Sequence, residues 1–188
     1  MKITKNNSYI KNIIPGQPTI TMSMGNPKLD KSILIFNLPS IITCPNCELC
    51  KNDCYARKAE KQYPSVLPCR MENWEASKLD NFEIRMIKTI TKVIKKYGVK
   101  SIRVHESGDF YSYNYAVKWQ RIATNIKTFI DKDIIFFAYT KSPHRPLQGF
   151  NIVESILPDG NINFADKKTV YKLAKKHKAR VCPYGLAY

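Results

Sequence analysis

Apolar residues recur at intervals of three and four positions through the middle of the chain and predict helices. The first such stripe lies between residues 70 and 97 and is followed by Gly98, a typical helix stop. It consists of Trp74, Leu79, Phe82, Met86, Ile87, Ile90, Val93, Ile94 and Tyr97. A second stripe consists of Tyr115, Trp119, Ile122, Ala123 and Ile126. The pattern therefore predicts one long amphipathic helix over 70–97 and a second helix over 115–126.

Short runs rich in β-branched and aromatic residues lie around these helices and predict strands. The runs lie at 19–24, 32–40, 99–107, 133–140 and around 150–156. The run at 133–140 is almost continuously apolar, which is typical of a parallel strand buried on both faces. A further helix is expected from about Asp166 to His177, followed by a last strand at 178–183.

The alternation of helices and strands predicts an α/β fold with a mostly parallel sheet and crossover helices. With about five strands the chain is too short for a closed eight-stranded barrel of ~250 residues, so a partial (β/α) barrel or an open sheet is expected. Residues 1–32 carry glycines and prolines among polar residues and are expected to form an extended N-terminal segment. No internal repeat or low-complexity linker interrupts residues 1–188, which predicts a single domain.

The composition indicates a folded and strongly basic protein. Hydrophobic residues make up 44% of the chain, which excludes the disordered class. No run approaches the roughly 18 apolar residues of a membrane span, and the first residues lack the apolar core of a secretory signal. A cytoplasmic protein with no membrane partner is therefore expected. The formal net charge of +16 indicates an anionic partner, with nucleic acid first, or else a compositional bias of the whole chain.

Four of the six cysteines lie close together in the segment 43–56, called the cysteine loop below. They are Cys44, Cys47, Cys50 and Cys54. A reducing cytosol favours metal binding over disulfides for such a group. The C-x2-C-x2-C-x3-C spacing is that of bacterial-type ferredoxins, where a remote cysteine followed by proline completes one cluster, and Cys182 precedes Pro183 here. The spacing favours an iron–sulfur cluster, 4Fe–4S first, with a tetrahedral zinc site as the alternative.

The cysteine pattern departs from that of ferredoxins in one respect. Cys54 is followed by Tyr55 rather than by proline, and the chain has no second run of this kind. A single cluster is therefore the most that these thiols can support. Cys69 stands apart, and a lone cysteine is more often a small buried hydrophobe than a ligand.

Ionisable residues follow the strand expected at 99–107. The carboxyl ends of parallel strands face the functional crevice in α/β folds, so His105, Glu106 and Asp109 are candidate catalytic residues. The alternative is structural: Asp109 can cap the next helix, and strand alternation turns His105 and Glu106 to opposite faces.

Two further sets of residues are candidates for cofactor binding. Gly108 would permit close approach of a cofactor to the backbone. Thr140 and Lys141 follow the next expected strand, and His144 and Arg145 come shortly afterwards. Basic groups in such a loop suit a phosphate or a carboxylate, although a solvated loop explains them equally well.

Several segments together resemble the phage gene product 88 family of uncharacterised proteins. They are GNPKLDKSILIFNLPSIITCP (25–45), CKNDCYA (50–56), RVHESGDFYSYNYAVKWQRIA (103–123) and FFAYTKS (136–142), in this order. The resemblance implies a phage or mobile-element protein of the host cytoplasm. The family's first cysteine group reads Cys-Pro, Cys, then Cys-Tyr-Ala, which maps onto Cys44, Cys50 and Cys54 and leaves Cys47 as an extra thiol.

A more remote resemblance is to radical-SAM enzymes, which carry a three-cysteine loop near the first strand of a partial α/β barrel. The C-x3-C-x2-C spacing of that superfamily is missing here, so S-adenosylmethionine is only weakly indicated. The sequence thus predicts an iron–sulfur protein of phage type, either a redox or radical-SAM-like enzyme or an electron carrier with a redox partner. The alternative is a basic nucleic-acid-binding module with a structural zinc site. The substrate and the oligomeric state are not indicated.

Overall fold

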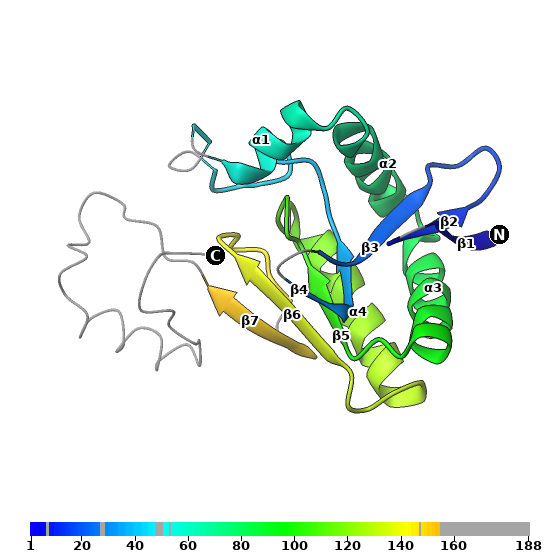
Figure 1. Ribbon diagram of the computed structural model, residues 1–188. Helices are drawn as coiled ribbons and strands as arrows, with labels where there is room; N and C mark the ends of the chain where they lie inside the picture. Colours follow the sequence, from blue (N-terminus) through cyan, green and yellow to red (C-terminus); the bar gives the residue numbers. More distant parts are fainter. Residues whose placement is uncertain (7, 27–28, 48–50, 53, 147, 155–188) are drawn as a thin grey trace, which may run out of the picture.

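Seven strands of the computed structural model form one mixed sheet (Figure 1). The structure describes residues 1–6, 8–26, 29–47, 51–52, 54–146 and 148–154. The strands are β1 (Lys2–Asn6), β2 (Tyr9–Ile13), β3 (Ile20–Asn26), β4 (Leu29–Phe36), β5 (Ser101–Val104), β6 (Ile135–Thr140) and β7 (Phe150–Glu154). They lie in the sheet in chain order. The pairings from β1 to β4 are antiparallel, and the pairings from β4 to β7 are parallel.

The α/β class is confirmed, but the prediction of a mostly parallel sheet is wrong. Residues 1–32 form strands β1 to β3 and the start of β4, rather than an extended segment with one short strand. The hairpin of β1 and β2 was not predicted, because apolar and polar residues do not alternate regularly along it. Its outer strand, β1, is mostly polar. The strand expected at 19–24 is present as β3, and the later strands lie within or close to their predicted positions.

Four helices occur in the described part of the chain. They are α1 (Tyr55–Gln62), α2 (Val66–Lys78), α3 (Phe82–Tyr97) and α4 (Tyr113–Phe129). α4 confirms the helix predicted over 115–126, and Ser112 caps it by accepting a hydrogen bond from the Tyr115 N–H. α1 was not predicted. The helix expected from Asp166 to His177 and the strand at 178–183 lie outside the described residues.

The single long helix predicted over 70–97 is wrong, because the chain breaks between α2 and α3. The Leu79 N–H donates to the Ala76 carbonyl, and the Phe82 N–H donates to the Leu79 carbonyl. Both are short-range turn bonds, and the backbone of Leu79 is extended. Leu79 and Phe82 nevertheless keep the three-residue spacing of the apolar stripe, so periodicity alone does not reveal the break.

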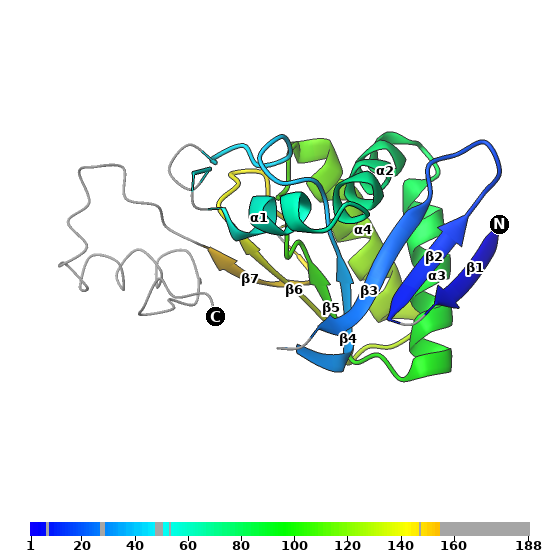
Figure 2. The same cartoon turned by 45° about the horizontal axis from the view of Figure 1, so that its top comes forward.

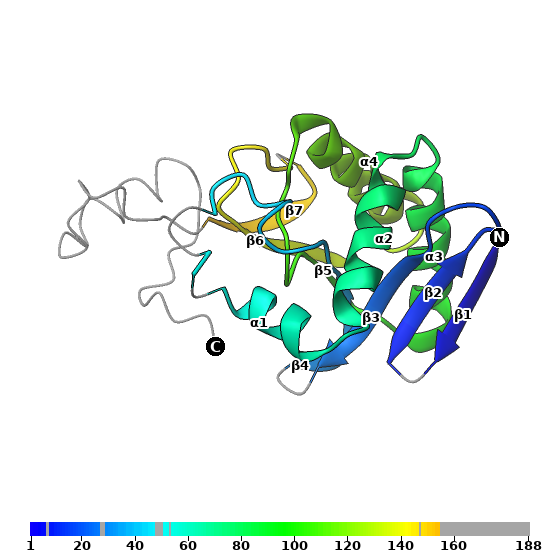
Figure 3. The same ribbon diagram turned by 90° about the horizontal axis from the view of Figure 1, so that it is seen from above.

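The main core lies between the sheet and the two helices α3 and α4, which pack side by side on one face (Figures 2 and 3). Trp119 of α4 is fully buried at its centre. Its ring lies 5.3 Å from that of Phe36 in β4 and 6.0 Å from that of Phe82 in α3, both with edge-on geometry. This aromatic cluster holds the parallel strands and both helices together.

A buried arginine joins α3 to the antiparallel half of the sheet. Arg85 is 1% exposed, and its guanidinium donates to the carbonyl oxygens of Asn12 and Pro18 at 3.1 and 2.8 Å. It also donates to the side-chain oxygens of Asn12 and Gln17. Burial lowers the pKa of Arg85 from its ordinary value. The cation is therefore held by neutral oxygens that would lose their donors without it.

Replacement of this arginine tests the connection. We expect Arg85→Leu to lower the free energy of unfolding by about 3 kcal/mol, because several buried acceptors would be left unsatisfied. Urea unfolding followed by circular dichroism measures the change. Arg121→Leu is the control, since Arg121 is exposed and its bond to Glu83 is 3.3 Å long. That change should cost under about 1 kcal/mol. Equal losses in the two variants would contradict the role given to Arg85.

Candidate functional site

Three loops follow the carboxyl ends of β4, β5 and β6 and meet at one edge of the sheet. Parallel pairing aligns these strand ends, as shown by the pairs Phe36 with Val104 and Arg103 with Phe137. In Figure 3 the cyan loop after β4 lies beside the yellow loop after β6. This edge, with its three loops, is called the strand-end rim below.

Asp109 lies at the centre of the strand-end rim and connects two of its loops. One carboxylate oxygen accepts hydrogen bonds from the Thr140 hydroxyl at 2.5 Å and from the Phe110 N–H at 2.8 Å. The other accepts from the Lys141 N–H at 2.9 Å. The structure thus brings together Asp109, Thr140 and Lys141, as predicted for this edge. Asp109 does not cap α4, because Ser112 does so.

The environment of Asp109 is buried and polar. The residue is 6% exposed, and Thr140 and Ser142 are each 1% exposed. Burial raises the pKa of Asp109, while its three hydrogen bonds and the nearby Lys141 ammonium partly oppose that effect. The Ser142 hydroxyl donates to the Phe110 carbonyl at 2.5 Å, which closes the connection between the loops after β5 and β6. A catalytic role of Asp109 stays a prediction.

The cysteine loop is attached to this rim at several points. The Asp109 N–H donates to the Thr43 carbonyl at 3.1 Å, just before the first thiol. The Asn46 side chain donates to the Lys141 carbonyl at 2.7 Å. Tyr55 follows the last thiol, and its hydroxyl donates to the Glu106 carbonyl. Both ends of the loop are therefore fixed to the loops after β5 and β6.

Cys44 lies within electrostatic range of the other described thiols of the loop and of Asp109. Cys44, Cys47 and Cys54 are partly buried and free of disulfides. Burial raises the pKa of Cys44 to about 12, and the charges of Asp109, Cys47 and Cys54 add to the increase. Cys54 directly precedes the first turn of α1, where backbone N–H groups favour negative charge.

The remaining predicted ligands are placed differently or lie outside the description. Cys50 and Cys182 are outside the described residues. Cys69 lies in the first turn of α2 and is not among the groups that raise the pKa of Cys44. Within the part of the chain that is described, no three His, Cys, Asp or Glu side chains are arranged to hold a metal ion.

His105 points into the core rather than into the rim. It is 2% exposed, and its Nε2 lies 2.9 Å from the Tyr115 hydroxyl. Its ring packs against Phe110 with a centroid distance of 4.6 Å. Burial lowers the pKa of His105 to about 3. This placement favours a structural role, and catalysis by His105 stays an untested prediction.

Glu106 follows His105 in the loop after β5. Its carboxylate is 3.7 Å from the guanidinium of Arg103, and its backbone carbonyl accepts the bond from Tyr55. Asn37 was not predicted, yet its side-chain oxygen accepts the N–H bonds of Glu106 and Ser107 at 2.7 and 3.0 Å. Asn37 thereby shapes the loop after β5. A lone asparagine after a strand gives no distinct sequence signal.

A second unpredicted group holds α1 beside the rim. Glu60 of α1 accepts hydrogen bonds from the backbone N–H and the hydroxyl of Ser40, at 2.8 and 2.6 Å. Arg70 of α2 pairs with Glu60 at 2.7 Å and donates to the Ala56 carbonyl. These contacts position the helix that begins directly after Cys54. They link residues far apart in the sequence, so no local pattern marks them.

Gly108 is required by close packing between two loops. Its φ is +79°, in the left-handed region, and an added Cβ would lie 2.6 Å from Leu38 Cβ and 2.6 Å from Thr43 Oγ1. The predicted role in cofactor approach stays untested, and the structure gives this glycine a packing role.

The two positions Gly108 and Gly98 allow a matched test of this packing. We expect Gly108→Ala to lower the free energy of unfolding by about 3 kcal/mol or more, through backbone strain and the two close contacts. Gly98→Ala shares the left-handed backbone, with φ +64°, but its Cβ would meet nothing within 4 Å, and about 1 kcal/mol is expected. Denaturant unfolding measures both. Equal losses would rule out the packing role.

The buried histidine predicts a specific dependence of stability on pH. The folded protein keeps His105 neutral down to about pH 3, whereas the unfolded chain takes up this proton below about pH 6.5. Because the unfolded state binds more protons in this window, stability falls as the pH falls. The contribution at pH 5 is about 2 kcal/mol.

His105→Gln removes this contribution and supplies the comparison. Urea unfolding at pH 7 and pH 5 should show a loss in the wild type that exceeds the loss in the variant by about 2 kcal/mol. The difference between the two proteins cancels the effects of other titrating groups. The same pH dependence in both proteins would show that His105 is protonated in the folded state.

Comparisons with known proteins point to one family. The sequence model of the family described as Gene product 88 matches residues 4–162. The chain is 33% identical over 107 residues to the Gene 88 protein of Mycobacterium phage D29 and 28% identical over 107 residues to that of Mycobacterium phage L5. Each match covers 53% of this chain, but only 42% and 43% of the two phage proteins. No solved structure shows a significant match.

The family match covers the cysteine loop and the described helices and strands, apart from the first two residues of β1. No described helix is both long and apolar enough to cross a membrane. The resemblance to the phage gene product 88 family is confirmed by the family match and by both phage relatives. The chain belongs to the Gene product 88 family.

Proposed function

We propose that the cysteine loop binds an iron–sulfur cluster beside the strand-end rim, with 4Fe–4S as the preferred form. The observation that supports this most directly is the attachment of the cysteine loop to the strand-end rim, through the bonds of Thr43, Asn46 and Tyr55. Cys44 is also within electrostatic range of Asp109, Cys47 and Cys54. Cys50 falls between these thiols in the sequence and completes the spacing of a cluster-binding run. The proposal places the protein in the reducing cytoplasm of the host cell.

The attachment of the loop supports a bound cluster rather than a mobile run of thiols. Thr43, Asn46 and Tyr55 each bond to a loop that follows β5 or β6. These contacts bracket the cysteines, so the loss of conformational entropy on binding is reduced. Burial raises the pKa of the Cys44 thiol, so cluster binding would be coupled to the release of its proton.

The number of protein ligands determines what such a cluster can do. Ligation by Cys44, Cys50 and Cys54 would leave one iron open to a substrate or cofactor, as open positions do in catalytic zinc sites. Lys141, which is partly exposed at the same edge, would then be able to contact the bound molecule. A fourth thiol, from Cys47 or from the remote Cys182, would close the shell and favour electron transfer or a structural role.

Purification without oxygen, followed by iron, sulfide and zinc analysis, tests the proposal. We expect a brown protein with iron and sulfide in similar amounts. Cys50→Ser should lose most of the iron, because all arrangements considered use this thiol, whereas Cys47→Ser should keep it if the family's three-cysteine pattern holds. Cys69→Ser is the control outside the loop and should keep the full iron content.

Two results would reject the proposal. A colourless wild-type protein with one zinc per chain would assign the thiols to a structural zinc site. Equal iron in the wild type and in Cys50→Ser would show that the iron is bound elsewhere. A circular dichroism spectrum of each variant shows whether the fold is retained.

A further inference from the structure

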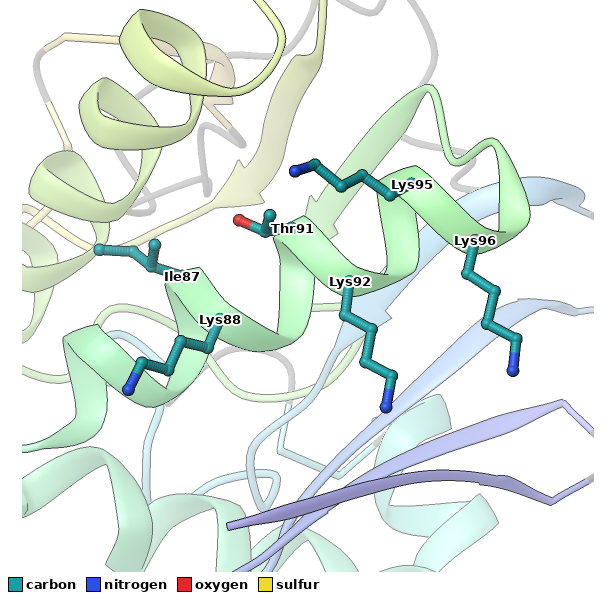
Figure 4. Close-up of a pocket in the computed structure, with 6 residues that line it drawn as sticks. All are labelled: Ile87, Lys88, Thr91, Lys92, Lys95 and Lys96. Atoms are coloured by element: carbon teal, nitrogen blue, oxygen red, sulfur yellow. The ribbon is translucent and has the colours of Figure 1, made fainter.

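The outer face of α3 carries four exposed lysines that the proposed cluster site does not use. They are Lys88, Lys92, Lys95 and Lys96. They lie beside Ile87 and Thr91 on this face of the helix. Figure 4 shows Lys88, Lys92 and Lys96 on one side of the helix and Lys95 on the other. The four lysines thus extend from the middle of α3 to its last turn.

The hairpin of β1 and β2 extends this basic surface. A hollow of about 290 Å³ lies between Lys92 and Lys96 of α3 and residues 3–5 of β1. The Lys5 ammonium lies 4.4 Å from the centre of the Tyr97 ring. Lys92 donates to the Ile3 carbonyl at 3.2 Å. Lys5 and the four lysines of α3 are together called the lysine surface below.

Neighbouring acidic residues do little to neutralise the lysine surface. Residues 1–26 contain no Asp or Glu. In α3 the acidic residue is Glu83, which lies in the first turn and pairs with Arg121 of α4. The helix dipole accounts for cations in the last turn, Lys95 and Lys96, but not for Lys88, which is more than one turn away. The positive charge therefore exceeds what the helix itself requires.

The chemistry of this surface fits a phosphate backbone. From Lys88 to Lys96 the helix rises about 12 Å, the axial length of roughly three to four phosphates along one DNA strand. The apolar face of α3 is buried in the core, where Met86, Ile90 and Val93 are fully covered, so it is not available for insertion into a bilayer. The Tyr97 ring is already covered by Lys5 and Lys96, which leaves it unsuited to stacking on bases.

We propose that the lysine surface binds the phosphate backbone of nucleic acid without reading its sequence. Charge supplies the affinity, and no base contact is involved. The surface lies away from the cluster site: α3 ends just before β5 begins, at the amino edge of the parallel strands, whereas the cysteine loop lies at their carboxyl edge. Binding of nucleic acid is therefore independent of the cluster.

Fluorescence anisotropy with a labelled DNA duplex of arbitrary sequence tests this proposal. The full chain is compared with a variant carrying Lys→Gln at positions 88, 92, 95 and 96 over a series of salt concentrations. Each phosphate contact contributes about 0.9 to the slope of log K against log salt. The slope of the variant should therefore be shallower by about 3 to 4.

A matched control separates this surface from the general basicity of the chain. Lys31, Lys58, Lys61 and Lys132 are exposed and lie outside the lysine surface. Changing these four to Gln removes the same charge, and the slope should change by less than about 1. Circular dichroism of both variants verifies the fold.

The outcomes are distinct. A shallower salt slope in the α3 variant but not in the control variant supports the proposal. This holds for duplex DNA and for single-stranded DNA of the same length. An equal decrease of the salt slope in both variants would overturn the proposal, because binding would then follow net charge alone. Absence of binding by the wild type at low salt would overturn it as well. Tighter binding to vesicles of anionic phospholipid than to DNA, abolished in the α3 variant, would assign the surface to membranes instead.

Discussion

The carboxylate of Asp109 holds together the two strand ends on which the candidate site depends. Its oxygens accept bonds from the Thr140 hydroxyl and the Lys141 N–H after β6, and its own N–H bonds to Thr43 in the loop after β4. One residue thus connects three successive loops of the parallel half of the sheet. Because it is almost fully buried, these bonds replace the water that the carboxylate loses on folding. The position of the cysteine loop follows from this connection.

The parallel and antiparallel halves of the sheet position different parts of the molecule. The parallel half aligns its carboxyl ends and places the loops that carry the thiols and Asp109. The antiparallel half completes the core through Arg85, which binds Asn12 of β2 and Pro18 in the turn between β2 and β3. It also places Lys5 beside the lysines of α3. The C-terminal end of α3, with Lys95 and Lys96, leads to the amino edge of the parallel strands, whereas the proposed cluster site lies at their carboxyl edge.

The sequence allowed the later strands, α4 and the shared edge of Asp109 and Thr140 to be predicted, because periodicity and parallel pairing are regular rules. The N-terminal hairpin was missed because a largely polar edge strand lacks the alternation that marks a half-buried one. The turn between α2 and α3 was missed because Leu79 and Phe82 continue the apolar spacing.

The orientation of His105 was also beyond a sequence argument. Strand alternation assumes extended backbone, but β5 ends at Val104 and His105 has a φ of 69°. The ring is therefore turned into the core, toward Tyr115. The contacts of Asn37 and Glu60 join residues distant in the sequence, and such tertiary contacts have no local signature.

We propose that the thiols of the cysteine loop hold iron beside Asp109, and the position of the metal decides whether they do. Crystals of the anaerobically purified protein, measured at the iron and zinc absorption edges, test this most directly through anomalous scattering. We expect a strong iron signal next to Cys44 and Cys54, at the carboxyl edge of β5 and β6. A zinc signal at that position, or iron located elsewhere in the molecule, would contradict it.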